Sequence, residues 1–339
     1  MPSLGATVVL DARWSQQQSG IGRFSREVLR RLPWSQSLRV GRPSSALDPF
    51  LAERLILSAQ TLLYCPGYNG GVTRARQLLT LHDLMHLGTE GSPLKRIYYD
   101  RLLRPIIQRC GRVLTVSRAS AEQIGVWLDD TRVSIDIVGN GVSFSIPSLE
   151  QLRSVAIGRR TGRGPLRLLY VGNMKSHKRF PVALHALRRL SGARLTVVSG
   201  DERALADLLA EVDLATRSRV AVVSNVTDES LSSLYRASDV LIMPSTEEGF
   251  GLPALEALIH ALPVVFWEGC IGLDETLGGF GTRVSDPSDA RAWAEAVERA
   301  GGSGLNVSTL LVDHLAKYSW DDVARRVERS IVEACHGRG

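Results

Sequence analysis

Short apolar runs alternate with segments of helical periodicity along the whole chain. A continuous apolar run is typical of a strand that is buried on both faces of a parallel sheet. Apolar positions that recur every three to four residues are typical of the helices that cover such a sheet. In the first 140 residues, the expected strands are 6–11, 61–64, 78–81, 113–116 and 134–138, and the expected helices are 23–32, 94–110 and 119–128.

This alternation is interrupted once. Residues 144–165 are rich in Ser, Arg and Gly and end in a turn-prone Gly-Arg-Gly-Pro sequence, which indicates a domain boundary. We therefore expect two doubly wound, Rossmann-like α/β domains with parallel sheets, at 1–145 and 166–318, with a linker at 146–165 and a final helical segment at 319–339. The later strands are expected at 167–171, 194–199, 220–223, 239–243 and 263–266, and the later helices at 181–190, 202–214, 229–237, 253–260, 288–300 and 320–334.

Composition and charge narrow the class of protein. A chain of 339 residues is long enough for two domains, and 44% apolar with 22% charged residues argues against disorder. Residues 1–150 contain 18 Lys and Arg against 12 Asp and Glu, whereas the remainder contains 23 of each class. The basic excess of the first half favours an anionic partner, either a phospholipid surface or a phosphorylated acceptor. We expect no nucleic-acid partner, because aromatic residues make up only 6% and no nucleic-acid motif is present.

The cysteines and the N-terminus bear on location. Cys65, Cys110, Cys270 and Cys335 stand apart, so neither a disulfide framework nor a metal site is expected, which fits a reducing compartment. The first residues lack the basic segment of a signal peptide, and no apolar run is long enough to span a bilayer. We expect a cytoplasmic protein, with peripheral contact at the inner face of the cytoplasmic membrane as a further option.

Ligands of open parallel sheets bind at the carboxyl ends of strands, so the strand-to-helix loops carry the candidate chemistry. In the first such loop, Gly20 and Gly22 would let the backbone approach an anion at a helix N-terminus, although a plain tight turn explains a lone pair of glycines equally well. In the second, His82 follows an apolar strand and precedes Asp83. His82 would donate a hydrogen bond to a developing charge or a sugar hydroxyl, or would cap the next turn.

Cations are concentrated in a third loop, between the strand at 167–171 and the helix at 181–190. Lys175, Lys178 and Arg179 crowd there together with His177. A helix N-terminus disfavours cations unless an anion lies between them, so we favour a phosphate site over a solvated basic loop.

Two acids frame a fourth, glycine-rich loop. Glu248 lies in the loop, Pro253 begins a helix, and Glu256 lies about one turn into it. Carboxylates bind sugar hydroxyls well, because each accepts two strong hydrogen bonds. A glutamate that only serves the helix dipole, with a second one on the surface, is the weaker interpretation in this apolar, glycine-rich context.

Together these loops resemble the retaining glycosyltransferase family four, in the GT-B superfamily, over nearly the whole chain. The most specific part is Glu-Gly-Phe-Gly-Leu-Pro-Ala-Leu-Glu at 248–256, which is similar to the E-x7-E signature of that family. The resemblance implies two Rossmann-like domains that face each other across a cleft, and a final helix that crosses back to the N-terminal domain. It also implies retention of configuration without a metal.

The resemblance further implies roles for individual residues. Glu248 would hold hydroxyls of the donor sugar, Glu256 would hold the ribose, and Lys178 would neutralise the diphosphate. His82 would lie beside the transferring sugar, and Gly22 would leave room for the diphosphate. The expected catalytic residues are His82, Lys178 and Glu248; the expected donor-binding residues are Gly20, Gly22, Asn173, Lys175, Arg179, Gly249, Phe250, Gly251, Leu252 and Glu256; and the expected acceptor-binding residues are Arg13, Trp14 and Asp83.

The chain departs from the family pattern at two positions. Asn173 stands where the family often has arginine, so Lys175 or Arg179 would have to supply that charge. Ala261 stands in a turn where the family often has glycine, a departure that is tolerable if Ala261 avoids the left-handed region.

The first-choice reaction is transfer of a hexose from GDP-mannose to a saccharide or lipid-linked saccharide, in bacterial polysaccharide or lipopolysaccharide assembly. A UDP-sugar is the second choice of donor. A GT-B nucleotide-sugar epimerase and a catalytically inactive sugar-nucleotide-binding subunit remain alternatives. The basic and apolar segment 95–112 would rest on an anionic membrane or would be an ordinary amphipathic helix, and Pro105 is expected to bend or break it.

Overall fold

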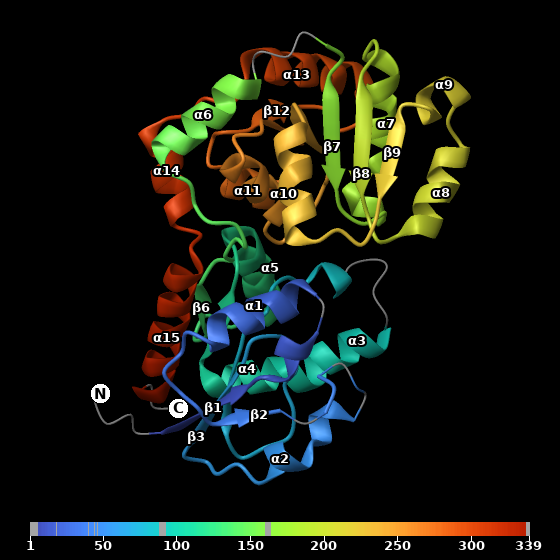
Figure 1. Ribbon diagram of the computed structural model, residues 1–339. Coiled ribbons are helices and arrows are strands. Elements are labelled where there is room, and N and C mark those ends of the chain that lie inside the picture. Colours follow the sequence, from blue (N-terminus) through green and yellow to red (C-terminus); the bar gives the residue numbers. More distant parts are fainter. Residues whose placement is uncertain are drawn as a thin grey trace. The chain divides into compact units, whose positions relative to one another are not determined.

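The computed structural model describes residues 6–17, 19–39, 41–43, 45, 47–87, 93–159 and 164–336. The chain forms two compact units (Figure 1). Unit 1 contains residues 1–141 together with 318–339, and unit 2 contains residues 142–317. The C-terminal segment therefore returns to the unit in which the chain begins.

A parallel sheet forms the centre of unit 1. Four strands lie in the order β2-β1-β3-β4, and every pairing is parallel. A second parallel pair, β5-β6, is joined to β4 by a bridge between Thr80 and Leu114. The parallel sheet that the apolar runs predicted is confirmed. The strands are β1 (Thr7–Asp11), β2 (Ser37–Leu38), β3 (Thr61–Cys65), β4 (Arg76–Leu79), β5 (Arg112–Thr115) and β6 (Ser134–Ile137).

Helices pack on the sheet of unit 1. α15 (Trp320–His336) lies against α1 (Gly20–Leu29) and β3. Leu103, Ile107 and Ile124 are wholly buried in a cluster that also contains Leu63 of β3. These side chains come from the helical segment at 93–110 and from α5 (Arg118–Leu128). The remaining helical elements of the unit are η1 (Arg13–Gln16), η2 (Asp48–Phe50), α2 (Ala52–Leu55) and η3 (Met85–Leu87).

Pro105 does not break its helix, which excludes one of the two expected outcomes, a bend or a break. The chain runs without interruption through α3 (Pro93–Tyr98), a π-helical segment η4 (Tyr99–Leu103) and α4 (Arg104–Cys110). Proline lacks a backbone N–H, and a helix tolerates that loss in its first turn. Here the change from π to α geometry places Pro105 in the first turn of α4, directly after the Arg104 amide that donates to the Tyr99 carbonyl.

Unit 2 is built on one six-stranded parallel sheet. Its strand order is β12-β11-β10-β7-β8-β9, which places the first strand, β7, in the middle. α7 (Phe180–Arg189) and α13 (Ala290–Ser303) bury Leu187, Trp293 and Val297 in a single core with the strands. The strands are β7 (Arg167–Val171), β8 (Arg194–Val198), β9 (Val220–Val223), β10 (Val240–Met243), β11 (Val264–Trp267) and β12 (Thr282–Val284). The remaining helices are α8 (Glu202–Ala210), α9 (Leu214–Arg217), α10 (Asp228–Ala237), α11 (Leu252–Ile259), α12 (Ile271–Leu277) and α14 (Thr309–Ala316).

A helix occupies much of the segment that we expected to be a linker. α6 (Leu149–Arg159) is held against unit 2 by Arg159, the last residue of the helix. The Arg159 guanidinium donates to the carbonyls of Tyr235 and Ser238 near the end of α10, and to that of His260 at the end of α11. Orphan carbonyls at helix ends need such donors, so this arginine fixes α6 in place. Residues 160–163 of the expected linker lie outside the described residues.

Ala261 lies in the left-handed region, at φ 51°, so the condition under which alanine is readily tolerated in this turn is not met. The Leu262 amide donates to the Ala257 carbonyl at 2.8 Å, which closes the helix end with a turn that needs a left-handed residue. A side chain in that conformation costs about 1–2 kcal/mol. The geometry of the turn has therefore overridden the preference of alanine.

Ala261→Gly should change the free energy of unfolding very little or increase it. Relief of the left-handed strain offsets the loss of one buried methyl group, worth about 0.8 kcal/mol. Ala257→Gly, at a buried position inside the same helix, is the matched control. It should lower stability by about 2 kcal/mol, because it loses helix propensity as well as the methyl group. If urea unfolding shows that Ala261→Gly and Ala257→Gly lose equal free energy of unfolding, the proposed strain at Ala261 is contradicted.

Candidate functional site

The order of strands brings two of the candidate loops together. β7 and β10 are neighbours in the sheet, so the loops that follow them, 172–179 and 244–251, leave the same edge. The Thr246 amide donates to the His177 carbonyl at 2.8 Å, and the Thr246 hydroxyl donates to the same oxygen. The cationic loop and the glycine-rich loop are thus tied to each other by Thr246, a residue that the sequence patterns did not single out.

Lys178 and Glu248 form an ion pair between these two loops. The Lys178 Nζ lies 2.7 Å from both carboxylate oxygens of Glu248. The two side chains are only 16% and 8% exposed, so solvent screens the pair weakly. The structure therefore joins the proposed phosphate-binding cation to the proposed sugar-binding acid.

The other polar residues of the cationic loop have different partners. Arg179 donates to the Ser288 hydroxyl at 3.0 Å, and the Lys175 side chain is exposed. The Asn173 side chain accepts from the Lys175 amide, so it shapes the turn. Burial lowers the pKa of His177, and the Lys178 cation acts in the same direction. Lys178 is therefore the cation of this loop that meets the glycine-rich loop.

A helix that the sequence did not predict supports the glycine-rich loop. At Gly272 of α12, a Cβ atom would lie 2.1 Å from the Glu248 carbonyl oxygen. The Thr276 hydroxyl of the same helix donates to the carbonyl of Phe250, whose own side chain is buried. Gly251 has a φ of +90°, which only glycine adopts readily, and Leu252 begins α11. α12 and Gly251 together set the path of the backbone from Gly249 to Leu252.

Glu256 is oriented by a buried tyrosine. The Tyr235 hydroxyl donates to Oε2 of Glu256 at 2.8 Å, and Tyr235 is fully buried. Burial raises the pKa of Tyr235, and so does the Glu256 carboxylate, so the phenol keeps its proton and donates. Glu256 itself is 5% exposed, which makes it far less accessible than we expected for a residue that faces an open cleft.

His82 in unit 1 donates one hydrogen bond within the unit and keeps its other ring nitrogen as an acceptor. Its Nε2 lies 3.0 Å from the Pro66 carbonyl oxygen, which only accepts, so Nε2 carries the proton. Burial lowers the pKa of His82, so the ring is neutral near pH 7 and Nδ1 is an acceptor. The Phe24 ring meets the His82 ring edge-on at 4.8 Å and fixes its plane.

The first-loop glycines differ in their surroundings. At Gly22, a Cβ atom would lie 2.0 Å from the Gln17 carbonyl oxygen, so the fold of the loop itself excludes a side chain there. The Gly22 amide donates to the hydroxyl of Ser19, the N-cap of α1. Apart from its chain neighbours and the backbone of its own helix, no heavy atom of the described chain lies within 4 Å of a Cβ built on Gly20. Gly22 therefore has a structural reason to be glycine, besides any role toward a diphosphate.

Two of the expected acceptor-binding residues lie inside unit 1. Arg13 is 1% exposed and Trp14 is 6% exposed. Arg13 pairs with Asp11 and with Asp48, and the Trp14 indole donates to Asn69. Because a buried side chain cannot contact an acceptor directly, we withdraw both from the acceptor site. Asp83 is half-buried and accepts from the Met85 amide, as in a turn cap.

The described part of the chain contains neither a candidate metal cluster nor a candidate membrane-spanning helix. Across the described residues, His, Cys, Asp and Glu side chains do not gather in any group of three or more that could hold a metal ion. None of the described helices combines the length and apolar character that crossing a membrane requires.

Comparison with known proteins gives consistent matches. Residues 165–301 match the family described as Glycosyl transferases group 1. The chain is 28% identical over 237 residues to a D-inositol 3-phosphate glycosyltransferase of Mycobacteroides abscessus, covering 65% of this chain and 51% of that protein. It is 24% identical over 288 residues to the O-antigen chain mannosyltransferase RfbU of Salmonella typhimurium, covering 84% and 78%.

The fold has counterparts among solved structures. A sucrose-phosphate synthase of Thermosynechococcus elongatus superimposes with a TM-score of 0.69 at 16% identity, covering 96% of this chain and 98% of that one. A likeness at this identity shows the fold alone. The chain spans about half the length of the inositol phosphate glycosyltransferase that it matches.

Proposed function

We propose that this chain, whose residues 165–301 match the family described as Glycosyl transferases group 1, is a retaining hexosyltransferase of the GT-B fold. It would move a hexose from a nucleotide diphosphate sugar to a saccharide or lipid-linked saccharide acceptor. The observation that carries the proposal is the ion pair of Lys178 and Glu248 at the carboxyl edge of the unit 2 sheet. A diphosphate needs a cation, and sugar hydroxyls need a strong acceptor.

The proposed reaction needs only groups of the protein and its two substrates. The bond from the anomeric carbon to the diphosphate breaks while the bond to the acceptor oxygen forms on the same face. The departing phosphate oxygen takes the proton of the acceptor hydroxyl. Lys178 and the amides of 249–252 would stabilise the negative charge that builds on the diphosphate. His82 would accept a hydrogen bond from a sugar hydroxyl, and the scheme uses no metal ion.

For the donor, we propose GDP-mannose first and a UDP-sugar second. Support comes from the relative named as an O-antigen chain mannosyltransferase, and a role in bacterial polysaccharide or lipopolysaccharide assembly would follow from the same likeness. A nucleotide-sugar epimerase would need an acid and base pair at the sugar. A binding subunit without catalysis would use Lys178 and Glu248 for binding alone, so turnover distinguishes it from a transferase.

A panel of nucleoside diphosphates tests the donor. A ligand that binds only the folded protein at a hundredfold excess over its dissociation constant stabilises it by about 2.7 kcal/mol. GDP should therefore raise the melting temperature more than UDP, ADP or CDP. Slow hydrolysis of the matching donor without an acceptor distinguishes a transferase from a binding subunit. A transferase is contradicted if no nucleotide binds and no donor is hydrolysed.

We also propose peripheral contact with an anionic membrane at the inner face of the cytoplasmic membrane, through α3. Leu94 is 77% exposed and Ile97 is 57% exposed, and both lie beside Lys95 and Arg96. In α4, by contrast, the apolar residues Ile106 and Ile107 are buried and belong to the core. The proposed membrane contact is therefore confined to α3, where apolar and basic side chains are exposed together, and does not extend over the whole basic segment 95–112.

Leu94→Glu combined with Ile97→Glu should weaken co-sedimentation with anionic vesicles about tenfold or more, because the change loses apolar contact and adds repulsion. The matched control is Leu310→Glu, which alters a leucine of unit 2 that is 71% exposed. It should bind like the unmodified protein. Binding that does not depend on the fraction of anionic lipid would contradict the contact.

A further inference from the structure

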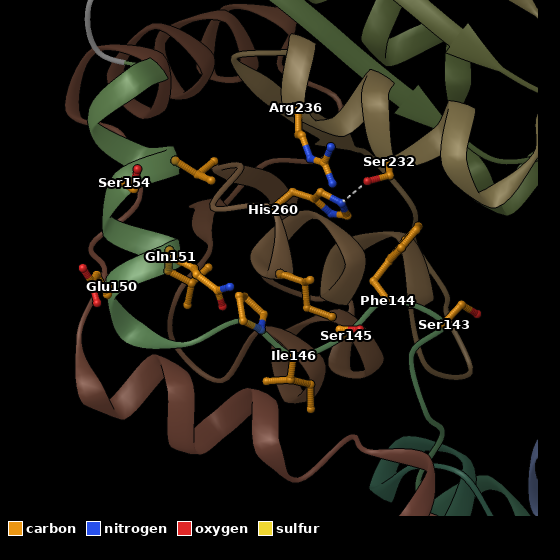
Figure 2. A pocket seen from close by; sticks show the side chains of 14 residues that line it. Ser143, Phe144, Ser145, Ile146, Glu150, Gln151, Ser154, Ser232, Arg236 and His260 are labelled. Atoms are coloured by element: carbon orange, nitrogen blue, oxygen red, sulfur yellow. Dashed lines mark hydrogen bonds between the residues drawn. The ribbon is translucent and has the colours of Figure 1, made fainter.

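A pocket of about 820 Å³ lies in unit 2, away from the loops that hold Lys178 and Glu248. Its walls are α6, the segment 143–147 and the ends of α10 and α11 (Figure 2). None of the residues that line it belongs to the loops 172–179 or 244–251. The pocket is therefore distinct from these two loops, although His260 in its wall bonds to the backbone of Glu256.

The inner wall of the pocket is a fixed hydrogen-bonded structure around His260. His260 Nδ1 lies 2.7 Å from the Glu256 carbonyl oxygen, so Nδ1 carries the proton. Burial lowers the pKa of His260, so the ring is neutral and Nε2 accepts from the Ser232 hydroxyl at 2.8 Å. Tyr235 stacks on the ring and Phe144 meets it edge-on at 4.8 Å. A wall held in this way exists before any ligand binds.

The lining combines apolar surface with neutral polar groups. Phe144, Ile146 and Pro147 supply apolar surface along one strip of the pocket. Figure 2 shows Gln151 on α6 and Arg236 on α10, on either side of His260. Serine hydroxyls complete the polar part of the lining, and Arg236 and Glu150 are its only charged residues among those described. One acid and one base give the lining no net charge.

We propose that this pocket is a second binding site, and that its ligand is a neutral saccharide of two or three residues. Sugars present hydroxyl groups that hydrogen-bond to planar amide and guanidinium groups, and they present C–H faces that pack on aromatic and aliphatic side chains. An acyl chain would need an apolar lining, and a phosphorylated ligand would need a cation in excess. The volume lies within the range of pockets that hold ligands of this size, about 300–1,000 Å³.

Saturation-transfer NMR with mannotriose and maltotriose as probes tests the site. The experiment contains no nucleotide, so it does not depend on the transfer reaction. At least one probe should receive saturation from the unmodified protein. Ser154→Trp fills the pocket from α6 and should weaken binding about tenfold or more, a difference that corresponds to 1.4 kcal/mol.

The matched control is Arg153→Trp, one position earlier on α6, where the side chain is exposed and does not line the pocket. It should bind the probe like the unmodified protein. If Ser154→Trp lowers the melting temperature, Arg236→Ala supplies the second variant and should also weaken binding, because its exposed guanidinium lines the pocket and can be removed without opening the core. Absence of saturation transfer from both probes overturns the proposal. So does equal binding by the two tryptophan variants.

Discussion

Glu248→Gln should lower turnover by about 10²–10³-fold, the range seen when one charge-stabilising group is removed from an active site. The change keeps the shape of the side chain but removes the charge that makes its hydrogen bonds to sugar hydroxyls strong. In the same variant, the affinity for the nucleoside diphosphate product should stay the same or rise. The reason is that Glu248 holds Lys178 at 2.7 Å through both carboxylate oxygens, so it competes with the diphosphate for this cation.

This prediction is specific because Glu248→Gln should lower turnover while the affinity for the product stays the same or rises. Lys178→Met should lower both, because the cation that would bind the diphosphate is gone. Glu247→Gln is the matched control, since Glu247 is the exposed neighbour of Glu248 and should change neither quantity. Turnover is measured as nucleoside diphosphate release, and affinity by calorimetry. A Glu248→Gln variant with near-normal turnover would remove the basis of the proposed function.

The parallel sheets and the two loops of unit 2 could be predicted because each depends on sequence that is local. The strands of unit 2 are continuous apolar runs, and the residues of the glycine-rich loop are consecutive. That the two loops lie near each other is also predictable in outline, because ligand-binding loops gather at the carboxyl ends of parallel strands. The pairing of Lys178 with Glu248 required the order of the strands, which places β7 beside β10.

What could not be predicted depends on contacts between distant residues. α6 buries only Leu152, so its sequence shows no apolar stripe, and its position depends on the carbonyls that Arg159 reaches. Tyr235 precedes Glu256 by more than one element, so no local pattern connects them. Gly272 is required by the close approach of the Glu248 backbone and by nothing in its own helix.

Arg13 is a residue for which the sequence predicted contact with a ligand, whereas the structure shows ion pairs inside unit 1. An arginine in a strand-to-helix loop suggests an exposed, ligand-binding side chain. Its partners, Asp11 and Asp48, are buried with it, and Asp48 comes from a turn far along the chain. The charge of this loop therefore serves the fold of unit 1, and its loss should show in stability.

The same buried cluster gives the second large effect, at Arg54. Arg54 is fully buried and donates to the Asn69 carbonyl at 2.9 Å and to the Asp48 carbonyl at 3.1 Å. It also lies 3.5 Å from carboxylate oxygens of Asp11 and Asp48. Two buried acids thus face two buried bases, Arg13 and Arg54. Removal of one partner from such a cluster leaves an uncompensated buried charge.

Arg54→Met should therefore lower the free energy of unfolding by about 3–5 kcal/mol, measured by urea unfolding. Adding Asp48→Asn removes the unpaired negative charge and should recover part of the loss, although Asp48→Asn alone should destabilise. Arg132→Met is the control, because Arg132 is exposed and an ion pair at the surface, such as the one it forms with Asp130, adds little to stability. If the loss of unfolding free energy in the double variant equals the sum of the losses in the two single variants, a charge balance shared by Arg54 and Asp48 is contradicted.

The pH dependence gives an independent check on Arg54→Met. Burial already raises the pKa of Asp48, and Arg54 is the strongest group that opposes this shift. Without Arg54 the folded-state pKa of Asp48 should rise further, so the folded variant binds a proton that the unfolded chain releases. A carboxyl group with a raised folded-state pKa favours the folded state at low pH and loses that contribution as the pH rises through the folded-state value. The loss of unfolding free energy caused by Arg54→Met should therefore shrink as the pH falls from 7 toward the ordinary aspartate pKa. A loss that does not depend on pH would indicate lost packing instead of an unpaired charge.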